Sequence, residues 1–168
     1  MIFRQRYIVT GVAIILTVLL LLISVPTIVI STPDGTPGLL VPLGRKKEFT
    51  VEYLHSVNKT PVQEHFVAAP DNQIILIGTD FRSLGVGTPF LSEEGQLVND
   101  QGVYRLTGMW RIFDKISYVT LDFTRLALLA EEDKYYLSDY FADGTIVEIK
   151  TARYPLIKFI YHRLRKGS

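Results

Sequence analysis

The stretch Tyr53–Phe66, "YLHSVNKTPVQEHF", holds the side chains of this 168-residue chain that are best suited to chemistry. An imidazole, His55, precedes a turn sequence, and a carboxylate, Glu64, follows it. If residues 58–61 form a four-residue hairpin loop, His55 lies directly opposite Glu64, with Cβ atoms about 5 Å apart. Both residues share a strand face that is otherwise apolar, where a carboxylate needs a partner. The sequence therefore predicts a His55–Glu64 pair that either ties two core strands together or lines a binding site.

Ser56 raises the possibility of a hydrolase, with its hydroxyl as nucleophile and His55 as base. Successive residues of a strand point to opposite faces, so this hydroxyl lies out of reach of the neighbouring imidazole. The chain also lacks a Gly-x-Ser-x-Gly nucleophile elbow. We therefore expect no catalytic residue, and Ser56 is kept only as a candidate for binding a ligand or partner.

A second unusual stretch, "DFRSLGVGTPF", covers residues 80–90 and combines Ser83 with Gly85 and Gly87. Loops of this composition expose backbone N–H groups that can hold an anion. The spacing matches neither the dinucleotide-binding nor the Walker glycine pattern. Two interpretations stay open, a tight turn and part of a ligand site, and in the second Ser83, Gly85 and Gly87 are candidate ligand contacts.

The residue types argue against a metal or a cofactor. The chain has no cysteine, which excludes disulfides, thiolate zinc sites and a cysteine nucleophile. Two carboxylates near the opening stretch, Asp71 and Asp80, are not spaced like a calcium loop. We therefore expect neither a metal site nor a cofactor.

Alternating hydrophobicity predicts that residues 48–153 form a β domain, a small sandwich or barrel. Residues 48–55, 73–81 and 116–123 are typical strands, with Gly78 placed to bend the second. The run "LALLAEEDKYYL" indicates two strands joined by an acidic turn, and Asp143-Gly144 indicates a hairpin.

The N-terminal region predicts a membrane anchor. Residues 7–30 contain no charged side chain, and Arg4 and Arg6 precede them, as expected at a cytoplasmic end. A cleaved signal peptide is the alternative, but the run is long for one and no Ala-x-Ala site follows. We expect an uncleaved anchor over residues 1–31 and a linker over residues 32–47.

Charge is distributed unevenly along the chain. Residues 32–153 hold 12 Lys/Arg and 17 Asp/Glu, so this part is acidic and poorly suited to nucleic acid. Residues 154–168 form a basic, amphipathic tail, expected to be helical after Pro155. This helix either lies on anionic lipid headgroups or packs on the acidic domain. Its candidate contacts to the membrane surface are Lys158, Arg163, Arg165 and Lys166.

Two short motifs resemble a known family. The residues Tyr-x-His-Ser-Val, then Pro-Val-x-Glu-x-Phe, then Ser-x-Gly-x-Gly-x-Pro are similar to those of domain-of-unknown-function family 1850. The likeness covers roughly residues 47–150. The resemblance implies a short exported or membrane-anchored protein encoded beside TRAP transporters of the TAXI type, which take up organic acids. It implies no reaction.

Together these features lead us to expect a non-enzymatic accessory or interaction subunit of a TAXI-type TRAP secondary transporter. Its expected partners are the transporter membrane subunit, the solute-binding protein, or both, and the lipid bilayer. The expected location is the inner membrane, single-pass, with the C-terminal domain outside the cytoplasm. The alternative is a module that binds an organic acid through His55, Glu64 and the 83–89 loop, and a hydrolase ranks third.

Overall fold

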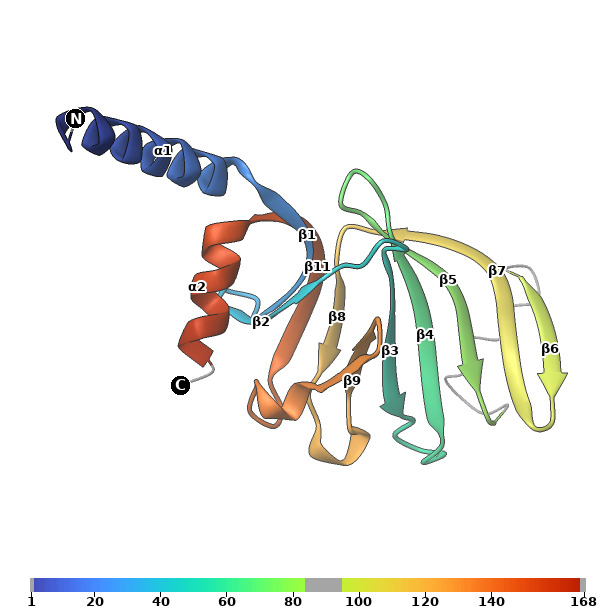
Figure 1. The fold of residues 1–168 in the computed structure, drawn as a ribbon. Helices are drawn as coiled ribbons and strands as arrows, with labels where there is room; N and C mark the ends of the chain where they lie inside the picture. Colours follow the sequence, from blue (N-terminus) through green and yellow to red (C-terminus); the bar gives the residue numbers. More distant parts are fainter. Residues whose placement is uncertain (1, 84–94, 167–168) are drawn as a thin grey trace.

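The computed structural model describes residues 2–83 and 95–166, and for part of the two helices it describes only the backbone. The described chain is two antiparallel β-sheets with a helix at each end (Figure 1). The elements, in chain order, are α1 (Ile2–Leu22), β1 (Ser24–Ser31), β2 (Pro37–Pro42), β3 (Glu48–Leu54), β4 (Pro61–Ala68), β5 (Ile74–Phe81), β6 (Gln96–Asp100), β7 (Val103–Phe113), β8 (Ile116–Val119), η1 (Asp122–Thr124), β9 (Ala127–Ala130), β10 (Asp133–Tyr136), η2 (Leu137–Asp139), β11 (Ile146–Pro155) and α2 (Leu156–Lys166).

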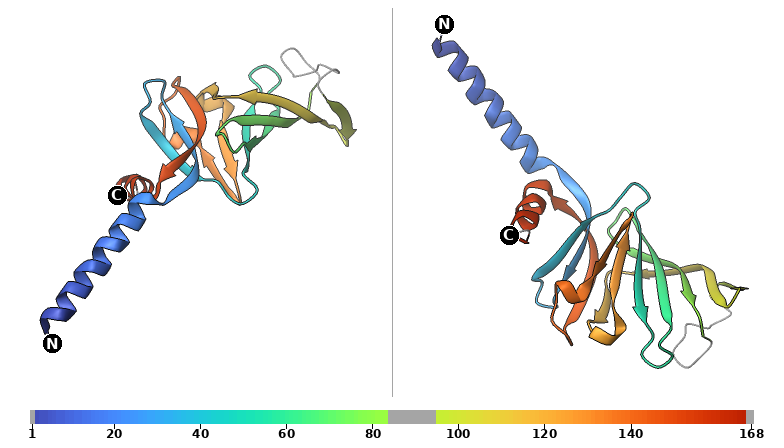
Figure 2. Two further views of the ribbon diagram at one scale, coloured as in Figure 1. Left: turned by 90° about the horizontal axis from the view of Figure 1, so that it is seen from above. Right: turned by 60° about the horizontal axis from the view of Figure 1, so that its bottom comes forward.

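The two sheets face each other as a sandwich, which agrees with the predicted mainly β fold. The smaller sheet has the strand order β2-β1-β11-β8, and the larger has the order β10-β9-β3-β4-β5-β7-β6. The larger sheet bends, so that β5, β7 and β6 extend beyond the smaller sheet (Figure 2). Strand β8, at the edge of the smaller sheet, faces β3 and β4, as the contact between the rings of Tyr118 and Tyr53 shows.

The core lies between the sheets and follows from alternation along the strands. On β3 and β4 every second side chain points inward, and Phe49 stacks on Phe66 with ring centroids 5.3 Å apart. Ile28 and Ile149 from the smaller sheet are fully buried against this face. Burial of apolar side chains contributes about 25 cal/mol per Å², so this shared core holds the sheets together.

The N-terminal strands correct the predicted domain boundaries. Residues 24–31, expected in the membrane anchor, form β1, the strand between β2 and β11 in the smaller sheet. Residues 37–42, expected in a linker, form β2. The run from Val25 to Ile30 is rich in β-branched residues that favour strands, and β11 pairs with it along its whole length. Periodicity does not separate a buried strand from a helix in so short an apolar run.

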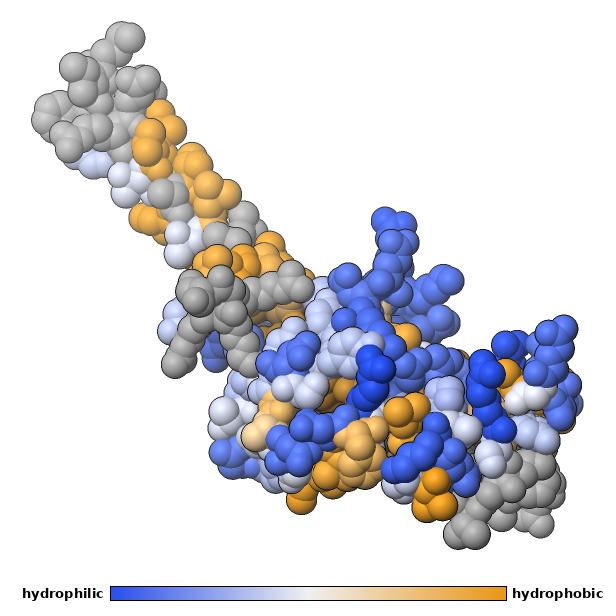
Figure 3. Space-filling view, turned by 90° about the horizontal axis from the view of Figure 1, so that it is seen from below, coloured by the Kyte–Doolittle hydropathy of each residue, from blue (hydrophilic) through white to orange (hydrophobic). Residues whose placement is uncertain are grey.

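Helix α1 projects away from the β domain (Figures 1 and 2). Its described apolar side chains are between 47% and 73% exposed, with the lower value at Val18 and the higher at Tyr7. Figure 3 shows these apolar side chains along the helix, next to a β domain whose surface is largely hydrophilic in this view. Among the residues that the structure describes, none of the helices combines the length and hydropathy needed to cross a membrane.

The predicted C-terminal helix is confirmed as α2, which begins directly after Pro155. It lies beside α1 and β2, and His162 Nε2 is 3.3 Å from the carbonyl oxygen of Pro37. Its apolar residues are only partly covered: Ile160 is 43% exposed and Leu164 is 70% exposed. Helix α2 lies at the same end of the molecule as α1 (Figure 1).

Three local predictions have different outcomes. Strands β9 and β10 form the hairpin with the acidic turn, and β5 has the bend at Gly78, where its register shifts. The hairpin predicted at Asp143-Gly144 is wrong. Gly144 does adopt a turn conformation with φ 76°, but this turn leads from η2 into β11, which pairs with β1 and β8.

Candidate functional site

The predicted pairing of His55 with Glu64 is wrong. Glu64 lies opposite Val51, and β3 ends before His55, at Leu54. The loop has six residues, because His55 N–H donates to the Thr60 carbonyl and the Lys59 N–H donates to the His55 carbonyl, with lengths of 2.8 and 2.9 Å. The longer loop shifts every pair along the strands by an even number of residues, so the apolar face keeps its members and Glu64 stays on it.

His55 and Ser56 belong to this loop. The His55 Nδ1 atom accepts hydrogen bonds from the backbone N–H groups of Val57 and Asn58, at 3.3 and 3.2 Å. This is the role of a turn-stabilising side chain, because it satisfies donors that no strand pairs. Ser56 is exposed in the same turn, and neither residue reaches Glu64 through a hydrogen bond that the structure gives.

The other candidates are scattered or lie outside the described residues. Ser83 is half-buried just after β5, whereas Gly85 and Gly87 lie outside the described residues. Lys158 is exposed on α2. Arg163, Arg165 and Lys166 lie in the same helix, where only their backbone is described.

Glu64 is held between two tyrosines. The Tyr118 hydroxyl group, on β8, donates a hydrogen bond to Glu64 Oε2. The Tyr53 hydroxyl group, on β3, donates one to Glu64 Oε1 over 3.4 Å. The two phenol rings are in tilted contact, with centroids 6.1 Å apart. Glu64 thus joins the larger sheet to the edge strand of the smaller one, and both of its oxygen atoms have a donor.

Burial is the main influence on the protonation of Glu64. It raises the pKa of the Glu64 carboxyl, because a charge is poorly solvated between the sheets. The hydrogen bonds from Tyr118 and Tyr53 and the positive charge of Arg111 act in the opposite direction but do not cancel this effect. Burial and the nearby carboxylate also raise the pKa of both tyrosine hydroxyls, so these groups stay protonated.

A cleft of about 330 Å³ opens beside Glu64. One wall is the inner face of the larger sheet, and the other is the start of β8 with the residue that precedes it. Arg111 reaches this cleft because its register partner is Leu76, which lies on the inner face opposite Phe66. The lining residues are Glu64, Phe66, Leu76, Arg111, Phe113, Lys115, Ile116, Ser117 and Tyr118.

A chain of ion pairs continues from one side of the cleft. The Lys115 ammonium group pairs with Glu148 Oε1, and Lys150 Nζ lies 2.8 Å from Glu148 Oε2. Hydrogen bonds from Lys115 and then Lys150 hold the pKa of Glu148 below its usual range. Two cations thus share one carboxylate, so this group keeps a net positive charge at the edge of the cleft.

The outer face of the larger sheet carries a separate polar row. Thr50 Oγ1 is 3.0 Å from His65 Nδ1, and His65 Nε2 is 3.7 Å from Asp80 Oδ2, which Arg105 also contacts at 3.3 Å. The order of groups resembles a hydroxyl–imidazole–carboxylate relay. These residues lie on three hydrogen-bonded neighbouring strands, where the backbone N–H groups are engaged in the ladder. An oxyanion needs such donors free, and along these paired strands the described backbone N–H groups are already engaged.

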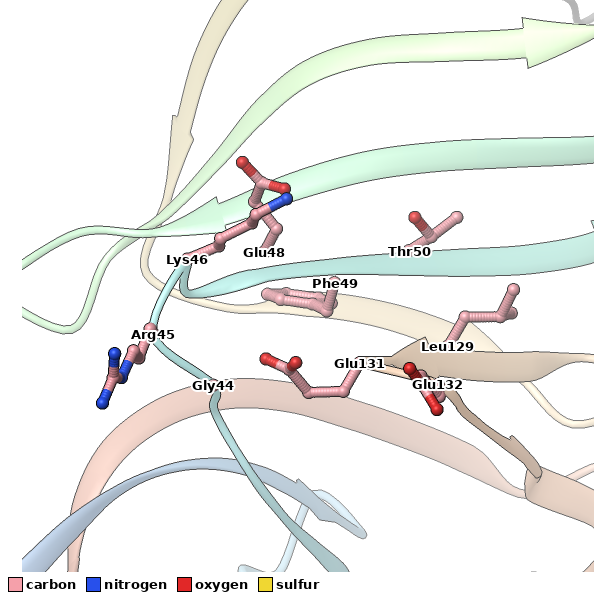
Figure 4. A pocket seen from close by; sticks show the side chains of 9 residues that line it. All are labelled: Gly44, Arg45, Lys46, Glu48, Phe49, Thr50, Leu129, Glu131 and Glu132. Atoms are coloured by element: carbon pink, nitrogen blue, oxygen red, sulfur yellow. The ribbon is translucent and has the colours of Figure 1, made fainter.

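A larger hollow, of about 740 Å³, lies where the β2–β3 connection meets the β9–β10 turn (Figure 4). In this view Lys46 extends toward Glu48, and the Glu131 carboxylate lies against Gly44. Arg45 and Glu132 complete a lining of mixed charge. Because the lining holds both acids and bases, its charge favours no single class of ligand.

Sequence reasoning missed three residues of the Glu64 cleft: Arg111, Lys115 and Tyr118. The sequence is misleading for Tyr118, because the alternation of Val119, Leu121 and Phe123 marks the opposite face as apolar, whereas Val119 and Phe123 are exposed in the structure. Arg111 carries no signal in the sequence, because its inward direction depends on the register shift between Leu76 and Gly78.

A family model described as "Domain of unknown function (DUF1850)" matches residues 49–137, just over half of the chain. The chain belongs to this family. The DUF1850 match runs from β3 to the first residue of η2 and includes Glu64, Arg111 and Tyr118. Strands β1, β2 and β11, which build most of the smaller sheet, lie outside the match. No curated protein and no solved structure matches the chain.

Proposed function

We propose that this DUF1850 protein is a non-enzymatic accessory or interaction subunit of a TAXI-type TRAP secondary transporter. In this proposal α1 holds the protein at the inner membrane, single-pass, and the β domain lies on the extracytoplasmic side. The observation that carries the proposal is the apolar surface of α1. Side chains such as Tyr7, Ile8 and Val9 are at least 60% exposed, and none of the described strands packs over them.

An exposed apolar surface of this extent is normally in contact with lipid or with another protein. Soluble monomers rarely expose continuous apolar patches larger than a few hundred Å², and lipid tails or the apolar face of a membrane partner would remove this one from water. Arg4 and Arg6 precede the apolar residues, which favours a cytoplasmic N-terminus. Helix α2 contacts α1 and also has exposed apolar side chains, Ile160 and Leu164.

The short connection between α1 and the domain supports a role in a complex. Ile23 alone separates the end of α1 from β1, and β1 lies inside the smaller sheet. A domain on such a connection has little freedom to swing, so its sheets take a fixed orientation relative to the membrane. A transporter subunit beside it would always meet the same face. The link to a TAXI-type transporter comes from the family resemblance.

Co-purification tests this proposal. The tagged chain, expressed with the membrane and solute-binding subunits of a TAXI-type transporter from the same genome, should retain them in mild non-ionic detergent. Val12→Glu with Leu16→Glu should release the protein from membranes and abolish the retention, because both side chains are exposed on α1. Val57→Glu is the matched control, since Val57 is 73% exposed in the β3–β4 loop. Recovery of the chain alone, with α1 intact, would refute the proposal.

A second function, binding of a small organic acid, is favoured by one observation. The Glu64 cleft combines two cations with apolar walls, which is the composition of small-molecule sites. The ligand class that this cleft fits is argued next.

A further inference from the structure

We propose that the cleft between β8 and the inner face of β4, β5 and β7 binds a small aliphatic monocarboxylate. Its carboxylate group would be held by Arg111 and Lys115, and its hydrocarbon body would lie against the apolar side chains Phe66, Leu76 and Phe113. This site goes beyond the proposed transporter role and does not depend on it, because the β domain alone supplies all of its lining.

The charges on the lining select an anion. Arg111 and Lys115 both line the cleft, whereas Glu64 is the only acidic side chain among its lining residues that the structure describes. Glu148 pairs with Lys115 but is shared with Lys150, so that group remains positive as a whole. The planar guanidinium group of Arg111 matches a carboxylate in shape and can donate two parallel hydrogen bonds.

Glu64 does not repel such a ligand when it is protonated. Both of its oxygen atoms already have tyrosine hydroxyl partners, from Tyr53 and Tyr118. Its burial between the sheets favours the neutral acid, as does the approach of a second carboxylate. The ligand would therefore bind together with a proton on Glu64, much as two neighbouring carboxyl groups share one proton.

The volume of the cleft and the polarity of its lining restrict the class of ligand further. A volume of about 330 Å³ is near the lower end of small-molecule pockets, so the ligand is small. Phe66 and Leu76 are almost fully buried and line the wall with hydrocarbon. A second carboxylate on the ligand would meet this apolar wall and lose hydration without a partner. The site therefore fits a short-chain monocarboxylate better than a dicarboxylate.

Calorimetric titration of the purified full-length chain in non-ionic detergent tests this inference. The probe is sodium n-butyrate, and butyramide is its uncharged counterpart of the same shape. Sodium succinate tests the preference for one carboxylate, and 2-aminobutyrate tests whether the site takes a zwitterion. No transporter is present, so the result is separate from the co-purification experiment.

Four variants locate the binding. Arg111→Gln and Lys115→Gln each remove a cation from the lining, and we expect Arg111→Gln to weaken butyrate binding at least tenfold. Arg105→Gln is the matched control, because Arg105 lies on the same strand but pairs with Asp80 on the outer face. Ser117→Trp places a large ring at an exposed lining position, so it should block entry without altering the core.

The expected result is saturable binding of butyrate, none of butyramide, and loss of binding in Arg111→Gln and Ser117→Trp but not in Arg105→Gln. The inference is overturned if butyrate does not bind, or if butyramide binds as well as butyrate. It is also overturned if succinate or 2-aminobutyrate binds more tightly than butyrate. If Arg111→Gln fails to fold, the proposal then depends on Ser117→Trp, and unchanged binding in that variant overturns it.

Discussion

The Glu64 carboxyl group accepts hydrogen bonds from two phenol hydroxyls, and the positive charge of Arg111 also acts on it. When a carboxyl group is paired with a cation, its ionisation stabilises the folded protein. Ionisation of Glu64 has the opposite effect on stability, because burial raises its pKa and its partners do not restore the ordinary pKa. Its protonation should therefore appear directly in the free energy of unfolding.

The pH dependence of stability follows from this sign. A carboxyl whose pKa is raised in the folded state binds its proton more tightly there than in the unfolded chain. The free energy of unfolding therefore falls as pH rises through the pKa that the carboxyl has in the unfolded chain. The loss is complete above the pKa that it has in the folded chain. Glu64→Gln should raise the free energy of unfolding near pH 7 and change it little near pH 4. Urea unfolding at both pH values measures this difference.

Glu132→Gln is the control for that experiment, because Glu132 is exposed in the β9–β10 turn. It should change stability equally little at both pH values. If Glu64→Gln behaves like Glu132→Gln, or loses more stability at neutral pH than at acid pH, then burial does not raise the pKa of Glu64 in the folded chain.

His55 provides a second test at the scale of single residues. Its Nδ1 atom accepts two backbone hydrogen bonds in the β3–β4 loop, and neither donor is shared with Glu64. His55→Ala should cost about 1 kcal/mol, the usual net value of such bonds. In a double-mutant cycle with Glu64→Gln, the two effects should add to within about 0.5 kcal/mol. A clearly larger coupling energy would restore the direct pairing that the sequence alone predicts.

At the scale of elements, the alternation of β3 and β4 can be predicted from the sequence, and their register cannot. Phe49, Val51, Val62 and Phe66 share the buried face as predicted. The register depends on the loop, in which Lys59 adopts φ 52°, a conformation that the residue type does not signal. The observed register differs from the predicted one by an even number of residues, so the same side chains face the core but each has a different cross-strand partner. The alternation of apolar residues therefore predicts which side chains are buried, but not which ones contact each other.

Strand β2 gives a prediction about packing. A Cβ atom on Gly38 would lie 2.1 Å from the Phe141 ring, which is buried. The same atom on Gly44 would meet the Glu131 carboxylate, which is exposed and flexible and can move away. Gly38→Ala should therefore destabilise the protein by about 1–3 kcal/mol through overpacking. Gly44→Ala should be close to neutral.

Thermal unfolding of the two alanine variants measures this contrast. Equal stability of Gly38→Ala and Gly44→Ala would mean that β2 does not pack on Phe141. In that event the segment 32–47 would behave as the linker that its proline and glycine content predicts.

At the scale of the whole molecule, the order of the strands ties the N-terminus to the C-terminus. The smaller sheet combines β1 and β2 from the start of the chain with β11 from its end. Such long-range pairing leaves no local mark in the sequence, which explains why residues 24–31 look like part of an anchor. The Glu64 cleft has the same origin, because β4, β7 and β8 contribute its charged and polar groups.

Two truncations test the position of β1. A chain that starts at Ile23 lacks α1 but keeps β1, and it should unfold cooperatively near the temperature of the full chain. A chain that starts at Thr32 loses the strand between β2 and β11, together with the buried Ile28 and Ile30. It should show no cooperative transition by circular dichroism. Cooperative unfolding of the shorter chain at an unchanged temperature would show that β1 is dispensable.

The proposed binding of a small carboxylate in the cleft beside Glu64 depends on Arg111. The most direct measurement follows the arginine Nε–Hε resonances of the ¹⁵N-labelled chain by nuclear magnetic resonance during titration with sodium n-butyrate. Arg111 and Arg105 lie on opposite faces of β7, so each serves as the reference for the other. We expect a saturable shift of the Arg111 resonance and a constant Arg105 resonance. A shift confined to Arg105, equal shifts at both, or no shift at either would contradict the proposed binding.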